Sequence, residues 1–368
     1  MLKNNLNLTF LKKSKAIFMM YSFMLISILF SCGGSSNQND NLTLTPSNLV
    51  VNTDIVGTSS SNPNGDGSGT VNFNISATNA TSYKILLGDG ETKEVTNGNF
   101  SYTYTTSGTN EFTIYVSAYN TGQFISTSTS ITIYVAPTEL WSDEFNTDGA
   151  PDSSKWGYDL GAGGWGNNES QYYTNRPENV IVQNGILKIT AKKESYQGAE
   201  YTSTRMKTQG KFSFKYGRVE IRAKLPSGGG TWPALWMLGS NISTVGWPAC
   251  GEVDIMEHAG NRQGIVQSAM HTPSSYGNTS NLGAQTLGDI STAFHVYAVE
   301  WTSEQMVFSV DGAVHYTYNP TPKNSSTWPF DANQFIIFNI AMGGGFGGTI
   351  DPAFSQSSME IDYIRVYN

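Results

Sequence analysis

Charged residues are scarce in this chain of 368 residues, at 14 % of the sequence, and the formal net charge is −8. A low and acidic charge disfavours nucleic acid as a partner, because phosphate backbones are bound by dense Lys and Arg. A neutral polymer is compatible with the same surface. Zinc is not indicated either, since the 4 His and 2 Cys show no zinc-ligand spacing. The glycine runs at 228–230 and 343–345 lack the Lys-Ser/Thr of a phosphate-binding loop and are interpreted as turns.

Long amphipathic helices are also missing, which disfavours a helical bundle. Short alternations of apolar and polar residues recur instead, for example at 112–118 and 216–225, between turns rich in Gly, Asn and Asp. We therefore expect an all-β protein of two domains. Residues 46–136 are predicted to form a small β-sandwich and residues 139–368 a larger two-sheet sandwich of jelly-roll type.

The tryptophans are confined to the second predicted domain, because all 8 lie at or beyond Trp141. Aromatic rings stack on the C–H faces of sugars, but they also fill cores, and composition does not choose between these roles. In the first domain, the run at 83–90 and the strand pattern that follows it resemble a polycystic-kidney-disease-type (PKD) immunoglobulin-like module. That resemblance implies a spacer or a weak glycan-binding role.

Only one long hydrophobic run occurs, at 16–30, and a lysine-rich stretch at 12–15 precedes it. This order predicts a secretory signal over residues 1–31. The cysteine that follows, Cys32, resembles the acylated residue of a bacterial lipoprotein signal. The resemblance implies a lipid anchor at Cys32, export to the bacterial outer membrane or cell surface, and a flexible tether over 32–45. An ordinary cleaved signal with an incidental cysteine is the alternative.

Three acids stand close together in the run Gly251-Glu252-Val253-Asp254-Ile255-Met256-Glu257-His258. In a regular strand Glu252 and Asp254 share a face, whereas Glu257, five positions after Glu252, points to the other side. One extra residue at Ile255 or Met256 would correct the phase. We therefore predict a β-bulge that puts all three carboxylates on one concave face.

Crowded carboxylates cannot all ionise easily, so at least one pKa is expected to rise. A carboxylate beside a carboxylic acid is the pair that glycoside hydrolysis requires, and carboxyls about 5–5.5 Å apart imply retention of configuration. An acidic edge strand or a divalent-cation site is the alternative, and the triplet alone does not exclude either.

Further blocks make the pattern specific, and the chain from 141 to 368 resembles glycoside hydrolase family 16 in its laminarinase branch, the endo-β-1,3-glucanases. The resemblance is carried by Gly251–Glu257 together with the runs at 164–173, 204–212, 232–239, 247–250, 294–301, 339–344 and 362–367. It implies that Glu252 is the nucleophile, Glu257 the general acid/base and Asp254 a hydrogen-bonding partner of the nucleophile. Spacing alone does not say which glutamate attacks.

The same resemblance implies residues that hold the sugar, namely Trp232, Trp236, Trp247, Asn168, Arg205, His271 and Asn339. For Trp236 a core role is the alternative, and for His271 a place in the wall of the cleft without sugar contact. The resemblance also implies a structural calcium ion, bound by backbone oxygens near Glu144 and Gly185 and by the Asp362 carboxylate.

The expected function is that of a monomeric, retaining endo-glycosidase that cleaves β-1,3-glucan such as laminarin, without a cofactor for catalysis. Mixed-linkage β-glucan or a galactan is the alternative substrate. A non-catalytic surface protein that binds glycans is the alternative from outside the enzymes. It would retain the tryptophans but not the three acids.

Overall fold

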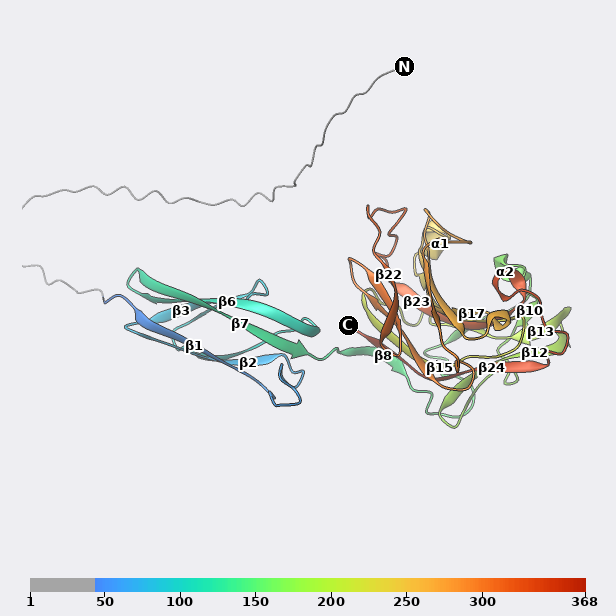
Figure 1. Cartoon of the computed structure of the whole chain (residues 1–368), viewed down its shortest axis with the longest axis horizontal. Helices are drawn as coiled ribbons and strands as arrows, with labels where there is room; N and C mark the ends of the chain where they lie inside the picture. The colour runs from blue at the N-terminus through green and yellow to red at the C-terminus, as the bar shows by residue number, and fades with distance from the viewer. Residues whose placement is uncertain (1–43) are drawn as a thin grey trace, which may run out of the picture.

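The computed structural model describes residues 44–368 as two bodies joined by the segment after Val135 (Figure 1). The predicted signal peptide, most of the predicted tether and the predicted acylation site Cys32 lie outside the described residues. Among residues 44–368, the structure contains no helix with the length and apolar character needed to cross a membrane.

The N-terminal body consists of two antiparallel sheets. One has the order β1 (Ser47–Ile55), β2 (Thr70–Thr78), β5 (Asn99–Thr103), and the other the order β4 (Thr92–Val95), β3 (Ser82–Leu86), β6 (Gly108–Asn120), β7 (Gln123–Val135). Alternate residues of β2 and β6, such as Phe73 and Ile114, point inward and form a separate core. A small β-sandwich was predicted here and is present. The PKD identity stays a prediction.

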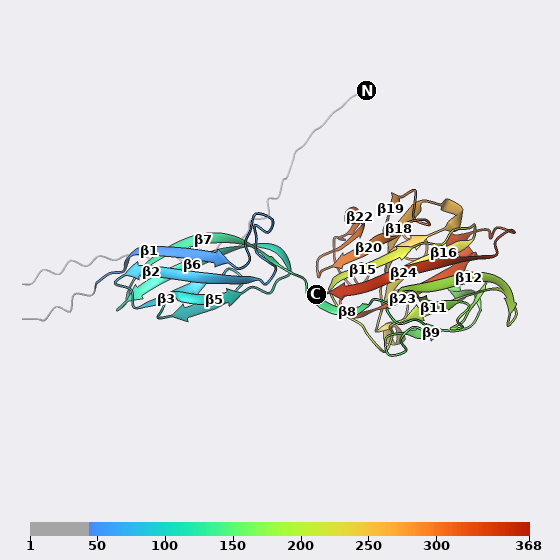
Figure 2. The same cartoon turned by 90° about the horizontal axis from the view of Figure 1, so that it is seen from below.

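The second body begins with β8 (Glu139–Asp143) and contains a ten-stranded sheet (Figure 2). Its central path runs β10 (Gln171–Tyr173), β13 (Ala199–Ser203), β12 (Ile186–Tyr196), β24 (Gln356–Tyr367), β15 (Gly217–Lys224), β20 (His295–Trp301), β21 (Met306–Val310), β22 (Ala313–Tyr318). Two further strands join it, β11 (Val180–Gln183) beside β12 and β8 (Glu139–Asp143) beside β24.

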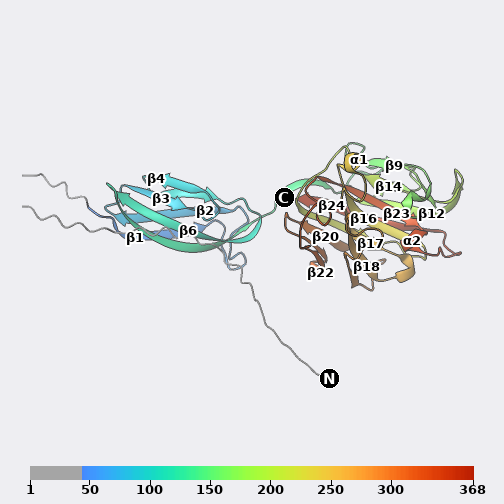
Figure 3. The same ribbon diagram turned by 90° about the horizontal axis from the view of Figure 1, so that it is seen from above.

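A seven-stranded sheet packs against the first and carries the predicted site (Figure 3). Its order is β19 (Leu282–Thr286), β18 (Ile265–His271), β17 (Glu252–His258), β16 (Thr231–Gly239), β23 (Gln334–Met342), β14 (Arg205–Lys207), β9 (Gly157–Asp159). The helices are single turns: η1 (Gly164–Gly166), α1 (Ile242–Val245), η2 (Gly260–Arg262) and α2 (Gly344–Gly347).

Alternation along the strands decides which face of the seven-stranded sheet is buried. In β16, Leu235 and Met237 enter the large core between the two sheets, whereas Trp232, Ala234 and Trp236 point to the opposite face. We call that opposite face, turned away from the large core, the outer face. The predicted all-β sandwich is confirmed, and its outer face is where the candidate site residues collect.

Candidate active site

The three acids of β17 share the outer face because the strand contains one extra residue. Trp236 pairs with Asp254, and the adjacent Leu235 pairs with Met256, so Ile255 is skipped. The side chains of both Ile255 and Met256 are buried in the large core. The predicted bulge is therefore confirmed, and it turns Glu257 back to the face that carries Glu252 and Asp254.

Each glutamate accepts a hydrogen bond from a tryptophan indole. Trp247 Nε1 donates to Glu252 Oε2 at 2.9 Å, and Trp232 Nε1 donates to Glu257 Oε1 at 2.9 Å. Both tryptophans were predicted to bind sugar, but their role as donors to the two glutamates was not foreseen. The indoles fix one oxygen of each carboxyl and leave the other free.

His271 lies beside Glu252 and Asp254. Its Nε2 is 3.3 Å from Asp254 Oδ2 and 3.6 Å from Glu252 Oε1. The backbone N–H of Gly277 donates to His271 Nδ1 at 3.1 Å. Because an N–H can only donate, Nδ1 is the acceptor, and the neutral ring carries its proton on Nε2, toward the two carboxyls.

Burial raises the pKa of all three carboxyls. For Glu257 the pKa rises to about 8, through burial first and then through repulsion by Asp254. For Glu252 the pKa likewise rises to about 8, through burial and then Asp254, while His271 and the Trp247 indole oppose that rise. Neutral pH thus favours protonated carboxyls in this site, and the raised pKa values alone do not distinguish Glu252 from Glu257.

Arg205 and Asn339 are neighbours across β14 and β23, at the level of Ala234 and Glu257. Asn339 accepts from Trp236 Nε1 at 2.7 Å and donates to the Tyr173 hydroxyl at 3.1 Å. The amide is therefore held in one orientation, at the level of Glu257 and separated from it by β16.

Trp236 is only 9 % exposed, and the Arg205 guanidinium lies 4.7 Å from the centre of its ring. Stacking of a sugar on Trp236, as first expected, would require Arg205 to move. Trp236 also holds Asn339 through its Nε1, and both stacking on a sugar and the alternative core role stay predictions. Arg205 in turn pairs with Asp159, with Nε 3.0 Å from Oδ2.

Aromatic side chains flank both glutamates. Trp247, 45 % exposed, meets Tyr276 edge to face at a centroid distance of 5.3 Å, and Trp232 meets Phe346 at 5.4 Å. Tyr276 and Phe346 were missed in the sequence. The signal for Phe346 was a lone aromatic within the glycine run at 343–348, which had been interpreted only as a turn.

Asn168 lies on an exposed loop, with a φ of 58°. The loop approaches the glycine run of α2, because Gly345 N donates to Asn167 O at 3.0 Å. Asn168 is thus brought near the Trp232 and Phe346 end of the outer face, and a direct role in binding sugar stays a prediction.

Two groups of residues bear on metal binding. Donor atoms of Glu252, Asp254 and His271 lie within 4.8 Å of one another, a spacing that a cation could bridge. They are the same groups that form the acidic site, so they need no metal to account for their proximity.

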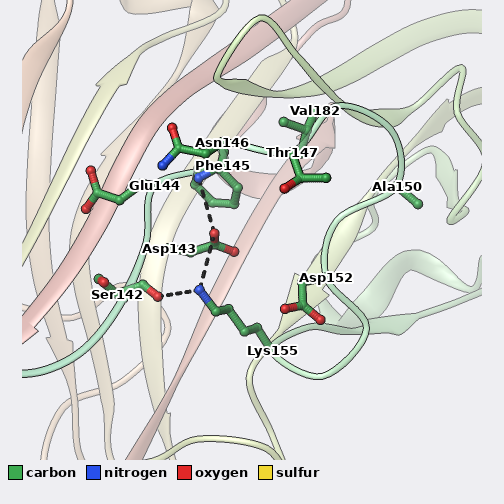
Figure 4. Close-up of a pocket in the computed structure, with 10 residues that line it drawn as sticks. All are labelled: Ser142, Asp143, Glu144, Phe145, Asn146, Thr147, Ala150, Asp152, Lys155 and Val182. Atoms are coloured by element: carbon green, nitrogen blue, oxygen red, sulfur yellow. Dashed lines mark hydrogen bonds and ion pairs between the residues drawn. The ribbon is translucent and has the colours of Figure 1, made fainter.

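The predicted calcium ligands lie on the ten-stranded sheet. Strand pairing brings the backbone near Gly185 and Glu144 alongside β24 around Asp362. The Asp362 carboxylate is paired with Arg222, and that of Glu144 with Arg365. Glu144 also lines a pocket of about 440 Å³ in which Lys155 approaches Asp143 (Figure 4). Calcium would have to share Asp362 with Arg222, and it stays a prediction.

Comparisons with known proteins identify the family to which the second body is similar. Residues 167–365 match the model of glycosyl hydrolases family 16. A β-glucanase of Rhodothermus marinus is 47 % identical over 245 residues, which cover 62 % of this chain and 84 % of that protein. A glucan endo-1,3-beta-glucosidase A1 of Niallia circulans is 38 % identical over 62 % of this chain, which spans only 37 % of that longer protein.

Among solved structures, a laminarinase from Flavobacterium sp. UMI-01 is 48 % identical, with a TM-score of 0.60. The match covers 63 % of this chain and all of that one. The N-terminal body lies outside the region matched by the family model. Since that model matches more than half of the chain, the protein belongs to family 16 of the glycosyl hydrolases.

Proposed function

We propose that this glycoside hydrolase is a retaining endo-β-1,3-glucanase in which Glu252 is the nucleophile and Glu257 the general acid/base. The observation that carries the proposal is the bulge of β17. It turns Glu252, Asp254 and Glu257 to one face, where each glutamate has its own indole donor.

The reaction has two displacements. In the first, a Glu252 carboxylate oxygen attacks the anomeric carbon while Glu257 donates its proton to the departing glycosidic oxygen. A covalent glycosyl ester and a shortened chain with a new hydroxyl result. In the second, water attacks the same carbon, Glu257 takes the proton of that water, and Glu252 leaves as a carboxylate. The net reaction adds one water across one glycosidic bond.

The neighbouring groups support these assignments. Glu257 is the more enclosed of the two glutamates, at 8 % exposure for the residue. Glu252 lies near the Nε2 proton of His271, and Asp254 lies between the two glutamates along the strand. The charge interaction with His271 favours the Glu252 anion. In this scheme Asp254 hydrogen-bonds the nucleophile and tunes its ionisation.

The linkage is proposed from the relatives, since the Niallia protein is named a glucan endo-1,3-beta-glucosidase and the Flavobacterium structure a laminarinase. We propose that Trp232, Trp247, Asn168, Arg205, His271 and Asn339 line the sugar path, with Trp236 behind them. Reducing-sugar release on laminarin, lichenan and agarose tests the linkage. Faster turnover of lichenan or agarose than of laminarin would replace β-1,3-glucan by the alternative substrate.

Glu252→Gln and Glu257→Gln test the assignment of the two glutamates. Each is expected to lower kcat on laminarin by at least about 10²-fold, because each removes a group that acts in the transition state. Glu300→Gln, at an exposed glutamate of β20, is the matched control and should retain activity. Wild-type turnover in either active-site variant would overturn the assignment, and binding of laminarin without product would favour the non-catalytic alternative.

We also propose acylation of Cys32 as the membrane anchor. Cys32→Ser should move the enzyme from the membrane to the soluble fraction.

We propose, separately, a calcium ion at Asp362. Chelation should lower the unfolding temperature if calcium is bound, and an unchanged temperature would refute that site.

A further inference from the structure

The extra residue of the bulge has no partner residue in either neighbouring strand. Ile255 is skipped in the pairing of β17 with β16 and again in its pairing with β18. Its backbone carbonyl is nevertheless satisfied, because the Ser268 hydroxyl donates to Ile255 O at 2.7 Å. Ser268 is completely buried on β18. A side chain thus supplies the donor that the interrupted ladder lacks.

A second residue orients that hydroxyl from the opposite sheet. His315 of β22 has its Nε2 at 2.9 Å from Ser268 Oγ. A hydroxyl has one proton, and the carbonyl of Ile255 can only accept it. His315 Nε2 must therefore be the donor to Ser268 Oγ. Burial lowers the pKa of His315, which favours the neutral ring that this arrangement uses.

Gly283 of β19 allows β22 to pack closely against the seven-stranded sheet. Gly283 of β19 pairs with Ser268. A Cβ on Gly283 would lie 2.6 Å from the Cβ of Tyr316 and 3.0 Å from the backbone oxygen of His315. No φ restriction applies there, so the space itself excludes a side chain. Gly283, Ser268 and His315 thus join the two sheets directly behind the bulge.

The position of Glu257 depends on this contact, because only Met256 separates it from Ile255. Glu257 also pairs with Ala234 and Gln267 of the two neighbouring strands, and its side chain accepts a hydrogen bond from the Trp232 indole. A shift of about 1 Å at a catalytic group can cost about 10²-fold in rate. The Ser268 hydroxyl and His315 meet on the core side of the sheet, so they affect the reaction only through the backbone of β17.

We propose that Ser268 and His315 are positioning residues that hold the β17 bulge, and with it Glu257, in the geometry for proton transfer. This inference rests on the proposed function, in which Glu257 is the general acid. It extends the machinery of the site from the outer face of the seven-stranded sheet through the core to β22.

The test uses two substrates that differ in their need for an acid. Laminarin has a poor leaving group and requires the proton of Glu257. In a 2,4-dinitrophenyl β-laminaribioside, the leaving group is dinitrophenolate, which departs without protonation. In the full-length protein, Ser268→Ala is expected to lower kcat/KM on laminarin by about ten-fold or more. On the dinitrophenyl substrate it should change kcat/KM by less than about two-fold.

His315→Ala should act in the same direction, and the double variant should be no worse than Ser268→Ala, because the two residues act as one unit. Ser358→Ala is the matched control. It removes a hydroxyl that bonds Thr190 Oγ1 at 2.8 Å within the ten-stranded sheet, away from β17. It should leave both substrates unaffected.

Two results would overturn the inference: laminarin activity of Ser268→Ala within about two-fold of wild type, or equal losses on both substrates in a folded variant. If Ser268→Ala does not fold, Gly283→Ala provides the second test, since it displaces His315 and keeps the hydroxyl. The same substrate-dependent loss is expected. Glu257→Gln separates the two proposals, because wild-type activity of this variant on laminarin would refute the function, whatever Ser268 does.

Discussion

At the residue scale, the two glutamates have the same chemistry and differ in their surroundings. Glu252 lies near His271 Nε2, at 3.6 Å, and its side chain is 18 % exposed. Glu257 is more enclosed, and burial is the first cause of its raised pKa of about 8. The sequence could not order the two roles, because spacing carries no information on solvation. The surroundings do differ, since His271 lies near Glu252 and Glu257 is the more enclosed residue, and on that basis we propose the anion at Glu252 and the proton at Glu257.

The pH dependence of kcat/KM follows from the proposed protonation states, an ionised Glu252 and a protonated Glu257. A general acid must be protonated, so activity on laminarin should be lost as pH rises through the raised pKa of Glu257, about 8. Activity should also fall at low pH as Glu252 gains a proton. On the dinitrophenyl substrate, which needs no acid, the alkaline loss should vanish and the acidic loss should remain. Profiles of kcat/KM against pH for both substrates check this, and an identical alkaline limb on both would contradict the role of Glu257.

At the element scale, the phase of β17 decides which side chains share a face. The five-residue gap between Glu252 and Glu257 predicted a bulge, because a period of two can be counted in the sequence. The sequence did not choose between Ile255 and Met256, nor did it indicate Ser268. Which residue of β18 lies opposite the bulge depends on strand register, a non-local property. The same limit applies to Arg205 covering Trp236, since β14 and β16 are joined only through β23.

Changes of one residue in β17 should have opposite effects. Insertion of Ala between Ile255 and Met256 turns Glu257 toward the core if the bulge is retained, and moves it about 6.6 Å farther from Glu252 if the strand becomes regular. Both outcomes should abolish hydrolysis of laminarin. Deletion of Met256 leaves Glu257 four positions after Glu252, so a regular strand would keep it on the outer face and retain measurable activity. The loss of Met256 from the core costs about 2–5 kcal/mol. Activity per folded molecule, with folding checked by circular dichroism, makes the comparison, and equal activity in both variants would refute the phase argument.

At the scale of the whole molecule, the two bodies have independent cores. The core of the N-terminal body is formed between Val71 and Val135, and the large core between Phe145 and Val366. The change in composition around residues 136–138 marked this division in the sequence, because turn-rich linkers and a sudden rise in Trp are both local signals. Such local signals do not indicate the function of the N-terminal body. Exposed aromatics on its four-stranded sheet, Tyr115 and Phe124, do not by themselves identify a ligand.

A chain that begins at Ala136 should therefore fold and hydrolyse soluble laminarin with kcat/KM within about two-fold of the full-length protein, because the large core keeps all of its members. Starting there retains Thr138, whose carbonyl accepts from Asn368 N at 3.0 Å. It removes an exposed hydrogen bond from Ser107 to Asn368 O at 3.2 Å and the bond from Ala136 N to Gly67 O at 2.9 Å. Thermal unfolding of the full-length protein should show a transition that the shortened chain lacks. A loss of more than about ten-fold on soluble laminarin would show that the two bodies are coupled. A loss confined to insoluble glucan would instead assign glycan binding to the N-terminal body, since only an immobile substrate rewards a second attachment point on the same chain.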